Sequence, residues 1–158
     1  MLALRPFVAS DDAELISWFP SDEALQLFAG VAGAWPLTPA QLERRRSEPG
    51  VHAYSAQLVG RDGDVADVLA GHVELVEAGA GSIRLARVAI APALRGRGLA
   101  GQLVDRALDE ARRIGATSAG LLVVPGNVPA LRSYQRAGFV DAGVNHAFPQ
   151  YVWMTRSL

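Results

Sequence analysis

The clearest periodic pattern in the chain lies in residues 99–114 and predicts an amphipathic helix. Apolar side chains recur there at intervals of three and four positions, which places them on one face of a helix. Gly115 then provides a stop signal, because glycine readily adopts the left-handed conformation in which helices end. The apolar face of this helix consists of Leu99, Leu103, Val104, Ala107, Leu108 and Ala111.

The remaining chain alternates between short helical and strand-like stretches. Capping residues precede three helices that we expect to end near residues 19, 28 and 48, and a further helix is expected over residues 128–137. Residues 30–36 are expected to form a loop. Apolar runs bounded by turn residues predict seven strands, over residues 2–8, 52–59, 68–76, 82–90, 118–124, 139–143 and 150–156. The first of these is expected at a sheet edge, and the three between residues 52 and 90 as an antiparallel meander.

Composition is that of one globular domain over residues 1–158. Half of the residues are hydrophobic, a fifth are charged, and the formal net charge is −1. Near-neutral charge gives no electrostatic reason to expect nucleic acid or an anionic membrane as a partner. The run Arg44-Arg45-Arg46 is expected to form a solvated helix face. Neither a signal peptide nor a membrane span is recognised, so the cytoplasm is the expected location.

The absence of two residue types excludes several kinds of chemistry. The chain has no cysteine, which rules out disulfides, thiol nucleophiles and thiolate metal sites, and no metal site is expected. It also has no lysine, which rules out the P-loop of nucleotide-binding proteins.

The segment over residues 88–100 has the composition of an anion-binding turn. An apolar strand ends at Pro92, and a glycine- and arginine-rich turn, Arg95-Gly96-Arg97-Gly98, leads into the long helix. Gly96 and Gly98 allow a ligand to approach the backbone closely, and a helix N-terminus attracts phosphate groups. The alternative is a strand-to-helix turn that needs its glycines only for geometry.

A second segment has a comparable arrangement further along the chain. The short strand ending at Val124 is broken by Pro125-Gly126-Asn127, after which a helix runs to Gly138-Phe139. This helix carries Ala130 and Tyr134, three and seven residues after Asn127. Asn127 is in addition a natural helix N-cap.

The two segments together resemble the GCN5-related N-acetyltransferase (GNAT) family. Arg95-x-x-Gly98-x-Ala100 matches the pyrophosphate-binding signature of the family, and Asn127, Ala130, Tyr134, Gly138 and Phe139 match its second motif. The resemblance is good over about residues 82–140 and loose elsewhere. It implies a mixed α/β (α+β) fold in which a mostly antiparallel sheet is flanked by helices. In that fold the strands near residues 82–90 and 118–124 are parallel neighbours that splay apart.

The resemblance implies acetyl-CoA as co-substrate, with a defined set of binding residues. The backbone of the first strand would hold the pantetheine arm, and the following turn would hold the pyrophosphate. Asn127 would contact the pantetheine arm, and Tyr134 would act as general acid toward the departing thiolate. The expected cofactor-binding residues are Val88, Ala89, Ile90, Arg95, Gly96, Arg97, Gly98, Leu99, Ala100, Asn127, Ala130 and Tyr134.

The general base is where the sequence departs from the family. Two positions at which some members carry glutamate are Arg84 and Leu122 here. Glu74 is the acidic residue that we assign to catalysis, with Glu77 and His72 as further candidates. A water chain acting on an amine that is already deprotonated is another route.

The expected activity is direct transfer of an acetyl group to a primary amine of a small molecule or a protein N-terminus. Aromatic residues near the chain ends are candidates for an acceptor pocket, and the acidic turn at residues 21–23 is a candidate contact for a cationic amine. The rival hypothesis is a catalytically silent acyl-CoA-binding or sensing domain of the same fold. The sequence leaves the identity of the amine and a homodimeric state open. The aromatic candidates are Trp18, Phe19, Phe28, Trp35, Phe148, Tyr151 and Trp153.

Overall fold

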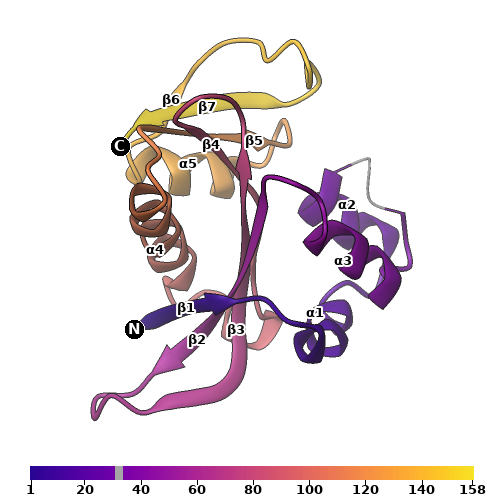
Figure 1. The fold of residues 1–158 in the computed structure, drawn as a ribbon. Coiled ribbons are helices and arrows are strands. Elements are labelled where there is room, and N and C mark those ends of the chain that lie inside the picture. The colour runs from indigo at the N-terminus through magenta and orange to yellow at the C-terminus, as the bar shows by residue number, and fades with distance from the viewer. Residues whose placement is uncertain (31–33) are drawn as a thin grey trace.

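A seven-stranded sheet runs through the molecule in the order β1-β2-β3-β4-β5-β7-β6 (Figure 1). The computed structural model describes residues 1–30 and 34–158, so the central part of the loop expected at residues 30–36 lies outside the described residues. All strand pairs are antiparallel except β4 with β5, as expected. The strands are β1 (Leu2–Pro6), β2 (Val51–Val59), β3 (Val65–Glu77), β4 (Ser82–Ile90), β5 (Ser118–Val123), β6 (Val140–Asp141) and β7 (Val152–Ser157).

The predicted element order is confirmed, with small differences at the element ends. β1 lies at the sheet edge, and β2, β3 and β4 form the expected meander. β6 is shorter than expected, and a 3-10 turn over Ala9–Asp11 precedes the first helix. The helices are α1 (Asp12–Ser17), α2 (Asp22–Ala29), α3 (Pro39–Arg46), α4 (Leu99–Arg113) and α5 (Val128–Arg136), and further 3-10 residues cover Pro92–Leu94.

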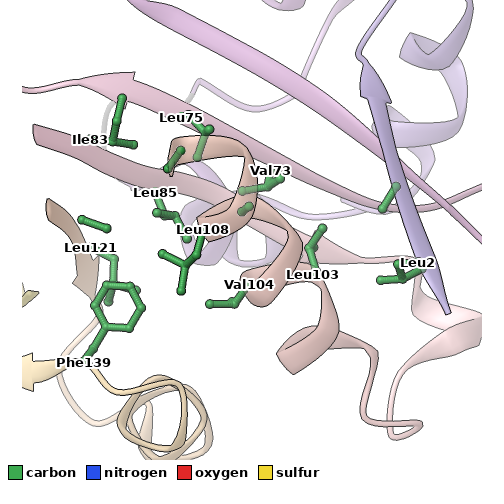
Figure 2. Close-up of a cluster of buried hydrophobic side chains, with 14 of the residues drawn as sticks. Leu2, Val73, Leu75, Ile83, Leu85, Leu103, Val104, Leu108, Leu121 and Phe139 are labelled. Atoms are coloured by element: carbon green, nitrogen blue, oxygen red, sulfur yellow. The ribbon is translucent and has the colours of Figure 1, made fainter. Parts of the chain in front are cut away.

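Helices α4 and α5 cover one face of the sheet, and the main core lies beneath α4. The six apolar positions predicted from the periodicity of α4 are all buried. Figure 2 shows Leu103, Val104 and Leu108 of α4 among the apolar side chains of the sheet, together with Phe139, which lies between α5 and β6. Burying a leucine side chain contributes about 2 kcal/mol, so this face fixes the direction of α4 and with it the position of its N-terminus.

Helices α1, α2 and α3 lie on the opposite face of the sheet (Figure 1). They enclose a second core, and an ion pair joins α3 to β3. Asp11 is buried and accepts hydrogen bonds from Arg5, both at 2.7 Å, rather than capping α1 through its side chain. Arg46 of α3 pairs with the buried Asp12, so the expectation that the arginine run is a solvated face is wrong for this residue.

Strands β4 and β5 pair only over the first four residues of each. The register joins Ser82 to Ser118 and ends with Leu85 opposite Leu121, although both strands continue beyond these residues. The gap beyond Leu85 is the splay that the family resemblance implied. No helix among the described residues has the length and apolar character that a membrane crossing requires.

A bulge in β4 coincides with the start of the splay. His72 pairs with Ala89 and Glu74 with Ala86, so two residues of β4, Arg87 and Val88, lie opposite one residue of β3. Arg87 has a φ of 49°, a left-handed conformation that costs a residue with a Cβ about 1 kcal/mol. A bulge leaves part of its backbone without partners in the sheet, so β4 offers backbone groups to a ligand at this place.

Candidate active site

The turn between β4 and α4 has the geometry of an anion-binding helix N-terminus. Gly96 and Gly98 have φ values of 77° and 72°, in the left-handed region that glycine favours, and Gly98 is the N-cap of α4. Apart from the glycine itself and its chain neighbours, no described atom lies within 4 Å of the place that a Cβ would take at either position. Arg95 donates from Nε to the Ile90 carbonyl at 3.2 Å, which ties the turn back to the end of β4.

A cavity of about 690 Å³ opens at this turn, between the end of β4 and helices α4 and α5. It is large enough for a cofactor-sized ligand, since such sites have volumes of roughly 300–1,000 Å³. Ten of the twelve residues expected to bind the cofactor line it, namely Val88, Ala89, Ile90, Arg95, Gly96, Gly98, Leu99, Ala100, Ala130 and Tyr134.

Two of the expected cofactor residues do not line this cavity. Arg97 is exposed on the turn. Asn127 caps α5, because its side-chain oxygen accepts a hydrogen bond from the backbone N–H of Ala130 at 3.4 Å. The capping role that the sequence allowed for Asn127 is therefore observed, and its contact to a cofactor stays a prediction.

Gly96, Gly98 and Gly101 also have the G-x-G-x-x-G spacing of dinucleotide-binding turns, and β4, α4 and β5 form a strand–helix–strand unit. That motif additionally requires an acidic residue about 20 positions further on to bind the ribose. Strand β5 instead ends at Val123, which Val124 follows, and it diverges from β4. The described sheet is otherwise antiparallel, so these glycines do not indicate a Rossmann site.

A second cavity, of about 450 Å³, lies on the side of α2 and α3. Its walls come from β4, β5, those two helices and the segment before β7. Val88 and Tyr134 line both cavities, so the two meet where β4 and β5 separate. The arrangement provides a cofactor-sized cleft and a smaller pocket that share one boundary.

Tyr134 lies at that boundary as a partly buried side chain of α5. Its ring meets the ring of Phe139 edge-on, with centroids 6.2 Å apart. Burial raises the pKa of Tyr134 to about 12, so the phenol keeps its proton throughout the physiological range. It can therefore donate a hydrogen bond to a group in either cavity.

Glu74 lies in surroundings that do not suit a general base. Its side chain is 2% exposed, its Oε2 accepts a hydrogen bond from Arg45 Nε at 2.8 Å, and Arg87 Nη1 lies 3.8 Å from Oε1. Burial alone would raise the pKa of Glu74, but the adjacent His72 ring and the two guanidinium groups outweigh it and lower the pKa to about 2. A carboxylate with so low a pKa is a poor proton acceptor at neutral pH.

The second cavity brings together three arginines that the sequence analysis did not assign to the site. Arg45 of α3 and both Arg84 and Arg87 of β4 line it. Arg45 had been placed on a solvated face, but its side chain is only 19% exposed and contacts Glu74 and Glu48. The sequence signal for the β4 pair was two arginines within an otherwise apolar strand.

The aromatic candidates divide into two groups. Phe28, Phe148 and Tyr151 line the second cavity, whereas Trp18 and Phe19 are buried in the core beside α1. Trp35 and Trp153 are not among the described lining residues of either cavity. The acidic turn at residues 21–23 forms the start of α2 and, within the described part of the chain, lines neither cavity.

Comparison with known proteins agrees with this geometry. The chain is 31% identical to a mycothiol acetyltransferase of Brachybacterium faecium over 146 residues, 90% of this chain and 42% of the relative. It is 37% identical to a streptothricin acetyltransferase of Streptomyces lavendulae over 94 residues, 58% of this chain and 47% of the relative. The chain thus spans less than half the length of these curated relatives.

The fold is also found among solved structures. An aminoglycoside acetyltransferase in complex with coenzyme A superimposes with a TM-score of 0.77 at 20% identity, over 99% of this chain and 95% of that one. The model of the acetyltransferase (GNAT) family matches residues 21–139, which include the splayed strands, the glycine turn and Tyr134. The chain belongs to the acetyltransferase (GNAT) family.

Proposed function

We propose that this chain transfers an acetyl group from acetyl-CoA to a primary amine by direct attack of the amine on the thioester. The observation that carries the proposal is the meeting of two cavities at Val88 and Tyr134, where β4 and β5 separate. One cavity has the size and the glycine turn for a nucleotide-bearing donor, and the other has room for a small acceptor. Curated relatives named as acetyltransferases support the same reaction class.

Donor binding would follow from the backbone and the helix dipole. The pyrophosphate would lie against the N–H groups at the start of α4, where the dipole favours negative charge. The bulged end of β4, near Val88, would pair with the amides of the pantetheine arm. The thioester would then lie at the boundary of the two cavities, beside Tyr134.

In the reaction the amine nitrogen forms a bond to the thioester carbonyl carbon, and the carbon–sulfur bond breaks. The nitrogen loses a proton, and the sulfur leaves as a thiolate that accepts one. The Tyr134 phenol, with its pKa of about 12, would donate a hydrogen bond to this sulfur as its charge develops.

The proton of the amine would leave through water. Within residues 1–30 and 34–158, no Asp, Glu or His lines the second cavity. The arginines there disfavour a nearby ammonium ion, because like charges lower the pKa of an amine. The neutral, nucleophilic form of the acceptor is therefore favoured in this pocket without a protein base.

A silent acyl-CoA-binding domain is the second candidate, and the lack of a carboxylate or imidazole in the described lining of the acceptor cavity favours it. The two candidates differ in turnover. A silent domain would bind acetyl-CoA and release no thiol in the presence of any amine, whereas an acetyltransferase would release free CoA in step with an acetylated amine.

Acetyl-CoA binding is tested by thermal unfolding. Acetyl-CoA at 100 times its Kd stabilises the native state by about 2.7 kcal/mol, which raises the Tm of a chain of this size by roughly 5–10 °C. Adenosine lacks the pyrophosphate and pantetheine and is expected to have little effect. An unchanged Tm at saturating acetyl-CoA would overturn the proposal.

Position 98 offers a matched pair of variants for the pyrophosphate site. Asp and Asn both tolerate the left-handed conformation of Gly98 and have nearly the same size, so they differ mainly in charge. A carboxylate at about 4 Å repels each phosphate by about 1 kcal/mol in water, so Gly98→Asp should bind acetyl-CoA at least about tenfold more weakly than Gly98→Asn. Equal affinities of the two variants for acetyl-CoA would contradict the proposal that the pyrophosphate binds at this turn.

A further inference from the structure

The lining of the second cavity is positively charged, whereas a pocket for a polycationic amine would be expected to carry negative charge. Three arginines, Arg45, Arg84 and Arg87, line it, and no acidic residue in the described part of the chain does so. The residues at positions 31–33 are Val, Ala and Gly and carry no charged side chain. A cationic substrate entering this pocket would meet like charges at its walls.

The three guanidinium groups differ in how well their charges are matched. Arg45 lies 2.8 Å from Glu74 and 2.7 Å from Glu48. Arg87 shares Glu74 at a longer distance, 3.8 Å. Arg84 forms no ion pair with any of the described acidic residues, and the described contact of its guanidinium is with the ring of Phe148, 5.2 Å from the centroid.

An unmatched guanidinium in a partly buried position costs the folded protein free energy. Burial and the charge of Arg45 lower the pKa of Arg84 from its ordinary value, and the charge of Glu74 offsets only part of this. Arginine nevertheless stays protonated in proteins, so this cost is not removed by loss of a proton. An anion entering the cavity would remove the imbalance.

The position of Arg84 also suits recognition of an anion. The guanidinium carbon of Arg84 lies over the ring of Phe148, a cation–π contact that holds the side chain, and its N–H groups have no described hydrogen-bond acceptor. Arginine binds carboxylates through two parallel hydrogen bonds, which makes a carboxylate the fitting partner. Along β4, four residues or about 13 Å separate the backbone of Arg84 from that of Val88, so an acceptor whose amine and carboxylate are several bonds apart can extend from the Arg84 side chain toward Val88.

We propose that the acceptor is a small primary amine that also carries a carboxylate, which Arg84 binds while the amine faces the junction at Val88 and Tyr134. This inference rests on the proposed acetyl transfer and names its substrate class. Arg87 adds a second cation nearer the junction, and Phe28 and Phe148 provide apolar surface for the carbon skeleton between the two ends.

The experiment compares matched acceptors on the wild-type chain. The acceptors are α-amino acids and ω-amino acids of increasing length, each paired with its carboxamide, together with spermidine and kanamycin as polycations. Release of CoA and formation of the acetylated amine are both measured. A hydrogen bond to a charged group contributes about 1.5–3 kcal/mol, so the preferred acid should exceed its amide by at least about tenfold in kcat/KM.

Variants then assign that preference to a residue. Arg84→Gln should lower kcat/KM for the preferred acid at least tenfold and leave its amide within about threefold, so that the preference disappears. Arg84→Lys keeps the positive charge but lacks the paired N–H donors of the guanidinium, so it should retain part of the preference. Arg61→Gln removes the same charge from an exposed turn and should leave the preference unchanged. Because its charge is unmatched, Arg84→Gln should unfold at a Tm no lower than that of the wild type.

The outcomes separate this inference from the proposed function. Acetylation that favours the amides or the polycations, or that is equal within each pair, would overturn the carboxylate assignment and leave acetyl transfer standing. Binding of acetyl-CoA without acetylation of any carboxylate-bearing amine would also overturn it. Failure to bind acetyl-CoA would overturn the proposed function itself.

Discussion

Replacing Glu74 by glutamine tests the charge arrangement beside the second cavity. The side chain is 2% exposed, and its carboxylate lies between Arg45 and Arg87. Glutamine has nearly the same shape and keeps an oxygen that can accept the hydrogen bond from Arg45, but it removes the charge. Both guanidinium groups would then lack their shared anion in a partly buried site.

The expected magnitude follows from the pKa of this carboxyl group. Lowering it from 4.5 to about 2 corresponds to about 3 kcal/mol, at about 1.4 kcal/mol per pH unit. Removal of one partner from a buried ion pair typically costs about 3–5 kcal/mol, which agrees in size. At pH 7 we therefore expect Glu74→Gln to lose about 3 kcal/mol, a drop in Tm of roughly 6–12 °C for a chain of this length.

The same argument fixes the pH dependence. The folded pKa of Glu74 is lower than the unfolded one, so its contribution is fully present above about pH 5 and is lost as the pH falls toward 2. The difference in unfolding free energy between wild type and Glu74→Gln, measured in urea at several pH values, should shrink over that range. Glu77→Gln is the control, because Glu77 lies on the same strand but its side chain is 60% exposed, so it should change stability by less than about 0.5 kcal/mol.

The catalytic assignment of Glu74 is tested on the same variant. A residue that positions Arg45 and Arg87 should change KM for the acceptor and leave the shape of the kcat–pH profile as in the wild type. Loss of the acidic limb of that profile would restore Glu74 as the general base. A stability loss below 1 kcal/mol that does not vary between pH 7 and 3 would refute the ion-pair reasoning.

Two further predictions concern the boundary of the cavities and the sheet behind it. Tyr134→Phe should lower kcat by up to about 10²–10⁴-fold with little change in the Kd of acetyl-CoA. Because the pKa of the phenol is about 12, its ionisation should cause no loss of wild-type activity below about pH 11. An unchanged kcat under conditions where chemistry limits turnover would show that Tyr134 is a packing residue. Gly120→Ala should destabilise the chain by about 1–3 kcal/mol in urea unfolding, because a Cβ there would lie 2.7 Å from Cζ2 of Trp153. Gly101→Ala has open space around its Cβ position and should be neutral or stabilising. Equal effects of the two substitutions would contradict this description of the packing.

The sequence by itself determined the features that depend on neighbours along the chain. The period of α4, the glycines before it and the cap at Asn127 are local signals, because backbone conformation at these places is decided within a few residues. Two such segments at the right separation also carried the resemblance to the GNAT family, and it was this resemblance that implied the splayed strands.

The tertiary structure alone decided the charges of the second cavity. Arg45 lies on α3 and Arg84 on β4, and nothing in their local sequence indicates that they meet at one pocket with Glu74 beneath them. The pKa of Glu74 and the unmatched charge of Arg84 depend on burial and on partners from other elements, and these are set only when the layers pack. The glycine turn could thus be predicted because local backbone geometry creates it, whereas the charged second cavity required the fold because side chains from separate elements create it.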